Sequence, residues 1–191
     1  MNKRIKKIQS IGVRGVYIFT KAKIETAEQW ALHDKIKTLR NLGKDYMSLV
    51  RELNRICKTE ITVVENIVPT VGRALLANNL TNVSPTDDPR INFTSLGTGD
   101  TAVSNSDTQL ITETFRKATA SATNADNVAF VTAFYDATEV TGTFKEAGLH
   151  SNGTASANSG VLFSRVLLNA PTGIVKSSTE TLTIDYTLTI S

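Results

Sequence analysis

The sequence is poor in the residues that build covalent or metal-based scaffolds. Among its 191 residues there is a single cysteine, Cys57, so the chain cannot form an internal disulfide or a cysteine-built zinc site. It also lacks any run of about 18 apolar residues, which a helix needs to cross a membrane. Arg14 interrupts the apolar stretch that follows the basic start, so we expect no secretory signal.

Charge is distributed unevenly along the chain. Residues 1–60 contain 14 basic and 6 acidic residues, whereas residues 61–191 contain 7 basic and 12 acidic residues. A basic arm on an acidic body indicates that the N-terminal part meets an acidic surface, and a solvated helix face is the simpler alternative. Nucleic acid is not favoured as a partner, because the basic residues are not interleaved with aromatics and no binding motif is present.

The first 60 residues predict one strand followed by two helices. Val13–Ile24 is rich in β-branched and aromatic residues, which favours a strand. Thr26 and Gln29 have the spacing of a capping box, and apolar residues then recur at helical spacing up to a break at Gly43. A second apolar stripe follows over Lys44–Lys58. We expect an αα-hairpin that is too thin to form its own core and must pack on another element.

From residue 90 onward the chain has the pattern of an all-β domain. Short alternating or apolar runs are separated by polar turns. The candidate strands are Ile91–Leu96, Leu110–Lys117, Val128–Tyr135, Thr141–Leu149, Val161–Asn169 and Thr179–Ile190. This pattern predicts an α+β protein, in which an N-terminal strand and the αα-hairpin precede an antiparallel, jelly-roll-like β-sandwich. The expected domains are a basic docking region over 1–60, a connecting segment with a short helix over 61–89, and the sandwich over 90–191.

The residues that usually carry catalysis are not spaced for it. Neither His33 nor His150 has a second histidine or a cysteine at metal-ligand spacing, and no G-x-S-x-G nucleophile motif occurs. Four aspartates over residues 87–107 have the ligand chemistry for calcium but not the spacing of an EF-hand. The sequence therefore neither predicts nor excludes a calcium-binding loop. We predict no catalytic residues, no metal-binding residues and no cofactor, and expect that the protein is not an enzyme.

Several local patterns after residue 66 follow one another in a distinctive order. A G-T-G turn precedes a D-T-x-L-x-x-E-x-x-R segment, and an F-x-E-A-G-L strand and a threonine-rich closing strand come later. The matching residues are Gly97, Gly99, Asp107, Leu110, Glu113, Arg116, Phe144, Glu146, Gly148 and Leu149. In these residues the chain resembles the β-rich domain of bacteriophage tail-collar fibre proteins and similar small phage virion structural proteins. The resemblance covers about residues 66–191 and leaves the first 60 residues uncovered.

Three charged residues of these patterns lie inside apolar strand segments, where an unpaired charge is costly. They are Glu113, Arg116 and Glu146. We expect a Glu113–Arg116 or a Glu146–Arg116 pair to lock the sandwich. The alternative is that each residue lies on a solvated strand face. Arg165 occupies a similar apolar segment.

The resemblance implies a non-enzymatic structural protein of a tailed bacteriophage virion, assembled in the host cytoplasm. It implies association with further copies of the chain, with cyclic symmetry, and with another virion structural protein. A collar, baseplate or fibre-adaptor position on the tail is the first expectation, and a capsid decoration or head-fibre position is the alternative. A carbohydrate- or cell-surface-binding β-sandwich module is a further alternative, although few aromatics are available for a sugar platform.

The N-terminal region is the predicted docking element, because of its charge and its thin helical hairpin. Buried apolar anchors set affinity in an interface, while charges at the rim mainly set association rate. The predicted interface has Leu49, Val50, Leu53 and Ile56 as its apolar stripe and Lys3, Arg4, Lys6 and Lys7 as its basic rim.

Overall fold

The computed structural model describes residues 13–81, 88–168 and 172–190. In these ranges the chain forms three helices and eleven strands. The helices are α1 (Ala27–Asn41), α2 (Met47–Ile56) and α3 (Thr70–Thr81). The strands are β1 (Val13–Lys23), β2 (Lys58–Glu65), β3 (Ile91–Gly97), β4 (Glu113–Ala118), β5 (Ser121–Ala125), β6 (Val128–Tyr135), β7 (Gly142–Phe144), β8 (Glu146–Ser151), β9 (Val161–Leu167), β10 (Ile174–Lys176) and β11 (Glu180–Ile190).

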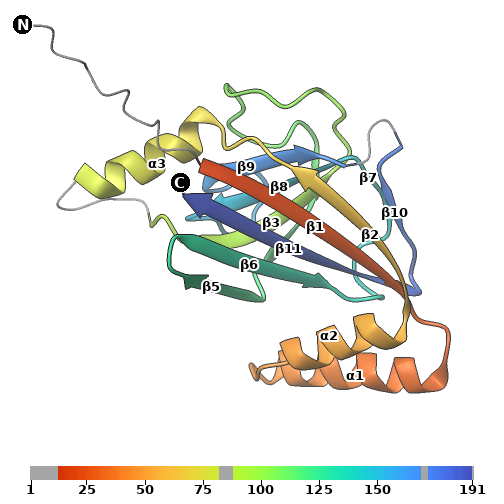
Figure 1. The fold of residues 1–191 in the computed structure, drawn as a ribbon. Helices are drawn as coiled ribbons and strands as arrows, with labels where there is room; N and C mark the ends of the chain where they lie inside the picture. Colours follow the sequence, from red (N-terminus) through yellow and green to blue (C-terminus); the bar gives the residue numbers. More distant parts are fainter. Residues whose placement is uncertain (1–12, 82–87, 169–171, 191) are drawn as a thin grey trace, which may run out of the picture.

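The strands form two main antiparallel sheets that pack face to face, with helices at their margins (Figure 1). The larger sheet has the order β2-β1-β11-β6-β5, and the smaller sheet has the order β4-β3-β8-β9. A separate two-stranded ribbon pairs β10 with β7. The prediction of an α+β protein with antiparallel sheets is confirmed.

The two ends of the described chain meet in the larger sheet. β1 pairs with β11 along its whole length, from Val13 opposite Ile190 to Lys23 opposite Glu180. β2 pairs with the other side of β1. β1 of the predicted docking region and β2, which lies mostly in the predicted connecting segment, therefore belong to the same sheet as the last strand, and the sandwich is not confined to residues 90–191. Periodicity in a sequence identifies strands but not their partners, which is why the expected boundaries divide a continuous sheet.

The main core lies between the two sheets. Because side chains alternate across a strand, every second residue of β11 points inward, including Ile184 and Tyr186. These side chains join the same buried cluster as Leu96, Leu149 and Phe163 from the smaller sheet. Burial of a side chain of this size stabilises the fold by about 1.5–3 kcal/mol. This core fixes the relative positions of the loops that connect the strands.

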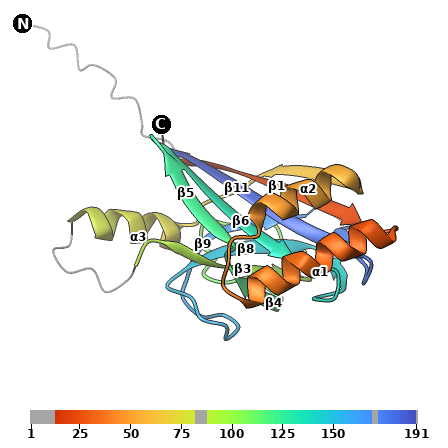
Figure 2. The ribbon, with the colours of Figure 1, turned by 90° about the horizontal axis from the view of Figure 1, so that it is seen from below.

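The helix pair α1 and α2 covers one end of the outer face of the larger sheet (Figure 2). The predicted capping box is present, because the Gln29 N–H donates to Thr26 Oγ1 at 3.3 Å and the Thr26 N–H donates to Gln29 Oε1 at 3.1 Å. Buried residues of both helices pack against Ala22 of β1 and Phe134 of β6. The helices thus pack on the sheet of their own chain, which supplies the further element that a thin helix pair needs.

Candidate functional site

The structure buries the centre of the predicted docking stripe inside the chain. Val50 and Leu53 are 1% and 0% exposed, and both pack in the cluster that contains Phe134 of the larger sheet. Leu49 and Ile56 are half-buried. Because the stripe already has a partner in its own chain, its assignment as a free docking surface is wrong. The predicted basic rim, Lys3, Arg4, Lys6 and Lys7, lies outside the described residues.

Glu146 is the centre of a buried polar network at the start of β8. Its side chain is 0% exposed, and its carboxylate accepts hydrogen bonds from three backbone N–H groups at 3.2, 3.1 and 2.7 Å. These groups belong to Gly99, Ile111 and Thr112. The fourth donor is Arg165 Nε of β9, at 2.8 Å from Glu146 Oε2. The partner of Glu146 is therefore Arg165 and not Arg116.

Arg165 extends this network into the long loop between β3 and β4. Its guanidinium is 1% exposed and donates to Asp107 Oδ2 at 2.8 Å and to the Thr101 carbonyl at 2.9 Å. Glu146 binds N–H groups of the same loop. Two buried opposite charges thus hold residues 98–112 by their backbone, and buried charges are tolerated only with such partners.

A second buried network holds the loop between β8 and β9. The predicted Glu113–Arg116 pair is confirmed, with both oxygens of Glu113 accepting from Arg116 at 2.7 and 2.8 Å and both side chains 2% exposed. Arg116 also donates to the Ser159 carbonyl at 2.6 Å, and the Asn158 N–H donates to Glu113 at 3.2 Å. This two-point Arg–carboxylate geometry is strong and directional, so the loop over residues 152–160 is fixed to the sheet.

His150 and Ser95 form a pair that sequence spacing did not reveal. Ser95 Oγ lies 2.7 Å from His150 Nε2, and both residues are 0% exposed. The charged side chain nearest to the ring is Arg116, at 3.4 Å, so no carboxylate orients the imidazole as a hydrolytic triad requires. Burial, together with the Arg116 charge, lowers the pKa of His150 to about 3. This neutral, enclosed pair is suited to packing the sheet and has no access for a substrate.

Two glycines of the recognised patterns leave room for the Glu146 carboxylate. A Cβ atom on Gly97 would lie 2.7 Å from Glu146 Oε1, and one on Gly99 would lie 2.5 Å from it. Gly148 similarly leaves room for the side chain of Leu110. Gly97, Gly99 and Glu146 therefore share one structural task with Glu113 and Arg116, which is to anchor two loops on the smaller sheet.

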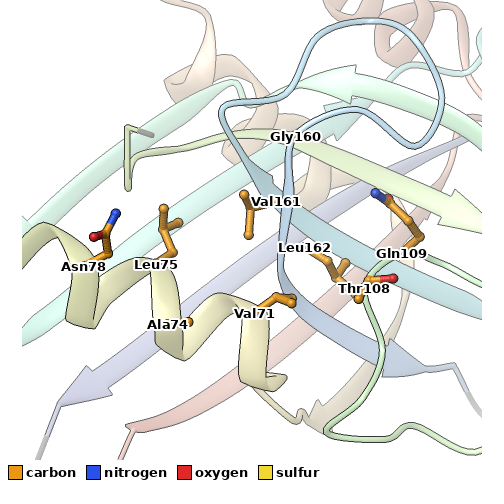
Figure 3. Close-up of a pocket in the computed structure, with 9 residues that line it drawn as sticks. All are labelled: Val71, Ala74, Leu75, Asn78, Thr108, Gln109, Gly160, Val161 and Leu162. Atoms are coloured by element: carbon orange, nitrogen blue, oxygen red, sulfur yellow. The ribbon is translucent and has the colours of Figure 1, made fainter. Parts of the chain in front are cut away.

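The anchored loops and α3 border a groove with a volume of about 470 Å³ (Figure 3). Figure 3 shows the α3 side chains facing Thr108 and Gln109 across the start of β9. Apolar residues from α3 and β9 make up much of the lining, and Gln109 Nε2 donates to the Asn158 carbonyl at 2.9 Å. The residues that line the groove are Val71, Ala74, Leu75, Asn78, Thr108, Gln109, Gly160, Val161 and Leu162. This composition has no charged group that could act on a substrate.

The part of the larger sheet that the helices leave uncovered is apolar where β1 and β2 meet. Ile61 and Val63 of β2 are 64% and 61% exposed. Ile18 of β1 lies directly opposite Val63 and is 36% exposed. We call Ile18, Ile61 and Val63 the free face. Exposed apolar side chains that gather in this way are typical of protein contact surfaces.

Aromatic side chains offer little support for the carbohydrate-binding alternative. All twelve aromatic residues of the chain lie in the described ranges, and Phe130 is the most exposed of them, at 40%. Trp30 is half-buried and packs edge-on against His33. A flat sugar-binding platform of several aromatic rings is therefore not present among these residues.

The aspartates considered for calcium are engaged with cations of the chain. Asp88 pairs with Arg90, Asp100 with Lys145, and Asp107 with Arg165, at 2.5, 3.0 and 2.8 Å. Asp87 lies outside the described residues. Within the described ranges no three histidine, cysteine, aspartate or glutamate side chains come together as a metal site.

Helices in the described part of the chain are all too short or too polar to span a lipid bilayer. Comparisons with protein-family models, with curated protein sequences and with solved structures gave no match. The function is therefore inferred from the arrangement of the residues themselves.

Proposed function

We propose that this chain is a non-enzymatic structural protein of a tailed bacteriophage virion, in a collar, baseplate or fibre-adaptor position on the tail. The observation that supports this proposal is the place of the charged residues through which the chain resembles phage structural proteins. Glu146, Glu113 and Arg116 all lie inside the fold and bind loop backbone or each other. Their task is to hold a surface in shape, which is what an assembly protein requires.

The two anchored loops suit this role because they are long and lack regular structure of their own. A loop held only at its ends would lose conformational entropy on contact with a partner, and this loss would weaken the contact. Glu146 and Arg165 hold one loop, and Glu113 and Arg116 hold the other, before any partner arrives. The surface is therefore preorganised for a neighbouring protein.

Self-association and anchoring to another virion protein are part of this proposal. The free face is available for one of these contacts, and the end of the sandwich with the anchored loops and the groove is available for the other. The apolar stripe of the helix pair does not provide a contact. This stripe is occupied by the sheet, as described above.

Electron microscopy of virions that carry a labelled copy tests the proposal. A label fused to the C-terminal end should appear at the collar, baseplate or fibre attachment site. Unlabelled virions and virions from a strain that expresses the label alone are the controls. Label on the head would contradict the tail position and support the capsid-decoration alternative. Purified virions without the chain would refute a virion role.

A further inference from the structure

β2 forms an edge of the larger sheet that the described residues leave open. Its eight residues pair with β1 on one side only, since β2 is the first strand in the order of the sheet. Residues 172–175 border a hollow of about 280 Å³ beside β2 and do not pair with it as a strand. β2 also contains no proline, and its pairing with β1 has no bulge; prolines and bulges are two of the devices that protect sheet edges from pairing.

The backbone of β2 presents its odd-numbered residues at this edge. The Asn66 N–H donates to the Gly15 carbonyl, so the pair of Gly15 and Asn66 is a hydrogen-bonded one. In an antiparallel ladder such pairs alternate, so the even residues of β2 bond to β1 and the odd residues direct their N–H and C=O groups away from it. Ile61 and Val63 are odd-numbered, and their side chains are exposed.

We propose that β2 pairs with β2 of a second copy of this chain, antiparallel and about a two-fold axis at Thr62. This inference deepens the proposed function, because it rests on the self-association that the proposed function includes. The larger sheets of two copies would then form one continuous ten-stranded sheet. Such an interface uses the same patch on both copies, as two-fold symmetry requires.

The side chains of β2 complement each other in this register. Ile61 of one copy lies opposite Val63 of the other, and both pairs fall on the same face as Ile18, so the two free faces join into one apolar stripe. The charged residues meet neutral ones, because Glu65 lies opposite Thr59 and Glu60 lies opposite Val64. No like charges oppose each other in this register. The strand of an unrelated protein would avoid like-charge pairs with β2 only by chance. This self-complementarity favours a second copy over a different protein as the partner.

The mass of the purified full-length chain in solution tests the pairing. Sedimentation at micromolar concentration should give twice the chain mass of 20.7 kDa. The double variant Ile61→Lys and Val63→Lys should sediment at the single chain mass, since it places two pairs of lysines opposite each other at the edge. Both positions are exposed, so the variant should keep the circular dichroism spectrum of the parent. Leu42→Lys, at a side chain that is 62% exposed in the turn between α1 and α2, is the matched control and should remain dimeric.

Cysteine crosslinking tests the register separately. Thr62→Cys places the two sulfurs on the axis, where opposed residues have Cβ atoms about 5 Å apart, and should give a covalent dimer under oxidation. Thr20→Cys lies one strand inward, at least about 14 Å from its copy, and should not crosslink. A monomeric parent, or a dimer that survives the lysine variant, would overturn the inference.

The outcomes separate this inference from the proposed function. A monomeric parent that is still found in virions would overturn only the pairing of β2. A dimer with the Thr62 crosslink that is absent from virions would overturn only the virion role.

Discussion

Replacement of Arg165 by methionine tests whether the buried charges hold the fold together. Methionine keeps much of the length and apolar volume of the side chain but removes the guanidinium, which lies 2.8 Å from both Glu146 and Asp107. Glu146 is then left as a carboxylate with no exposure and no cation. Loss of one partner of a buried ion pair destabilises a protein by about 3–5 kcal/mol. Since the free energy of unfolding of a typical domain is about 5–15 kcal/mol, the effect should be large and easily measured.

Urea unfolding, followed by circular dichroism and by the fluorescence of Trp30, measures this effect. Lys145→Ala is the matched control, because the Lys145–Asp100 pair has 35% and 67% exposed side chains and lies beside the same loop. Exposed pairs contribute about 0–1 kcal/mol, so the control should unfold almost as the parent does. An equal loss in both variants would show that burial of the pair has no special role.

The double variant Arg165→Met and Glu146→Gln isolates the charge from the packing. Glutamine removes the unpaired charge, and its amide oxygen can still accept from the Thr112 N–H that donates to Glu146 at 2.7 Å. We expect the double variant to be more stable than Arg165→Met alone, by about 1 kcal/mol or more. If the free energy of unfolding of Arg165→Met lies within about 1 kcal/mol of that of the parent, the network does not hold the loop.

Three further predictions concern buried titratable groups and the extent of the sandwich. His150 has a pKa of about 3 in the fold against about 6.5 when unfolded, so the unfolded chain binds the extra proton as pH falls through this range and stability is lost. Urea unfolding at pH 7 and pH 4 should show a smaller acid loss in His150→Gln than in the parent, and an equal loss would contradict this view. Lys176 is 1% exposed, and burial lowers its pKa to about 8, so stability should rise as pH increases from 8 towards 10.5. Lys176→Met should be more stable than the parent at pH 7 and should lack this rise, and a less stable variant would show that the hydrogen bonds of the ammonium group to backbone carbonyls outweigh its desolvation. A fragment that begins at Arg90 lacks β1 and should show no cooperative β-sheet melting by circular dichroism, whereas a cooperative transition would mean that β11 does not need β1.

Local features of the fold were predictable because they depend on neighbouring residues. The capping box at Thr26 and the strand over Val128–Tyr135 were identified correctly from spacing and periodicity. β5, over Ser121–Ala125, was missed because it is a short edge strand of small, mostly exposed residues and therefore carries no apolar alternation. β10 was missed because a strand of three residues is too short to show a period.

The contacts between distant segments were not predictable in the same way. A Glu146–Arg116 pair was one of two expected alternatives, but the register of β8 and β9 places Gly148 opposite Arg165 and so brings Arg165 to Glu146. That register is fixed by the whole sheet and not by local spacing. The apolar stripe of α2 was likewise recognised, yet its partner is the sheet of its own chain. An apolar stripe indicates that a helix face packs against another element, but it does not identify that element.

The number of copies of this chain in purified virions tests the central claim most directly, when it is measured for the parent and for the Ile61→Lys and Val63→Lys double variant. We expect the parent at a fixed number of copies in every particle and the double variant at strongly reduced occupancy, although its fold is unchanged. The control Leu42→Lys should match the parent. Normal occupancy of the double variant would contradict assembly through β2, and absence of the parent from virions would contradict the structural role itself.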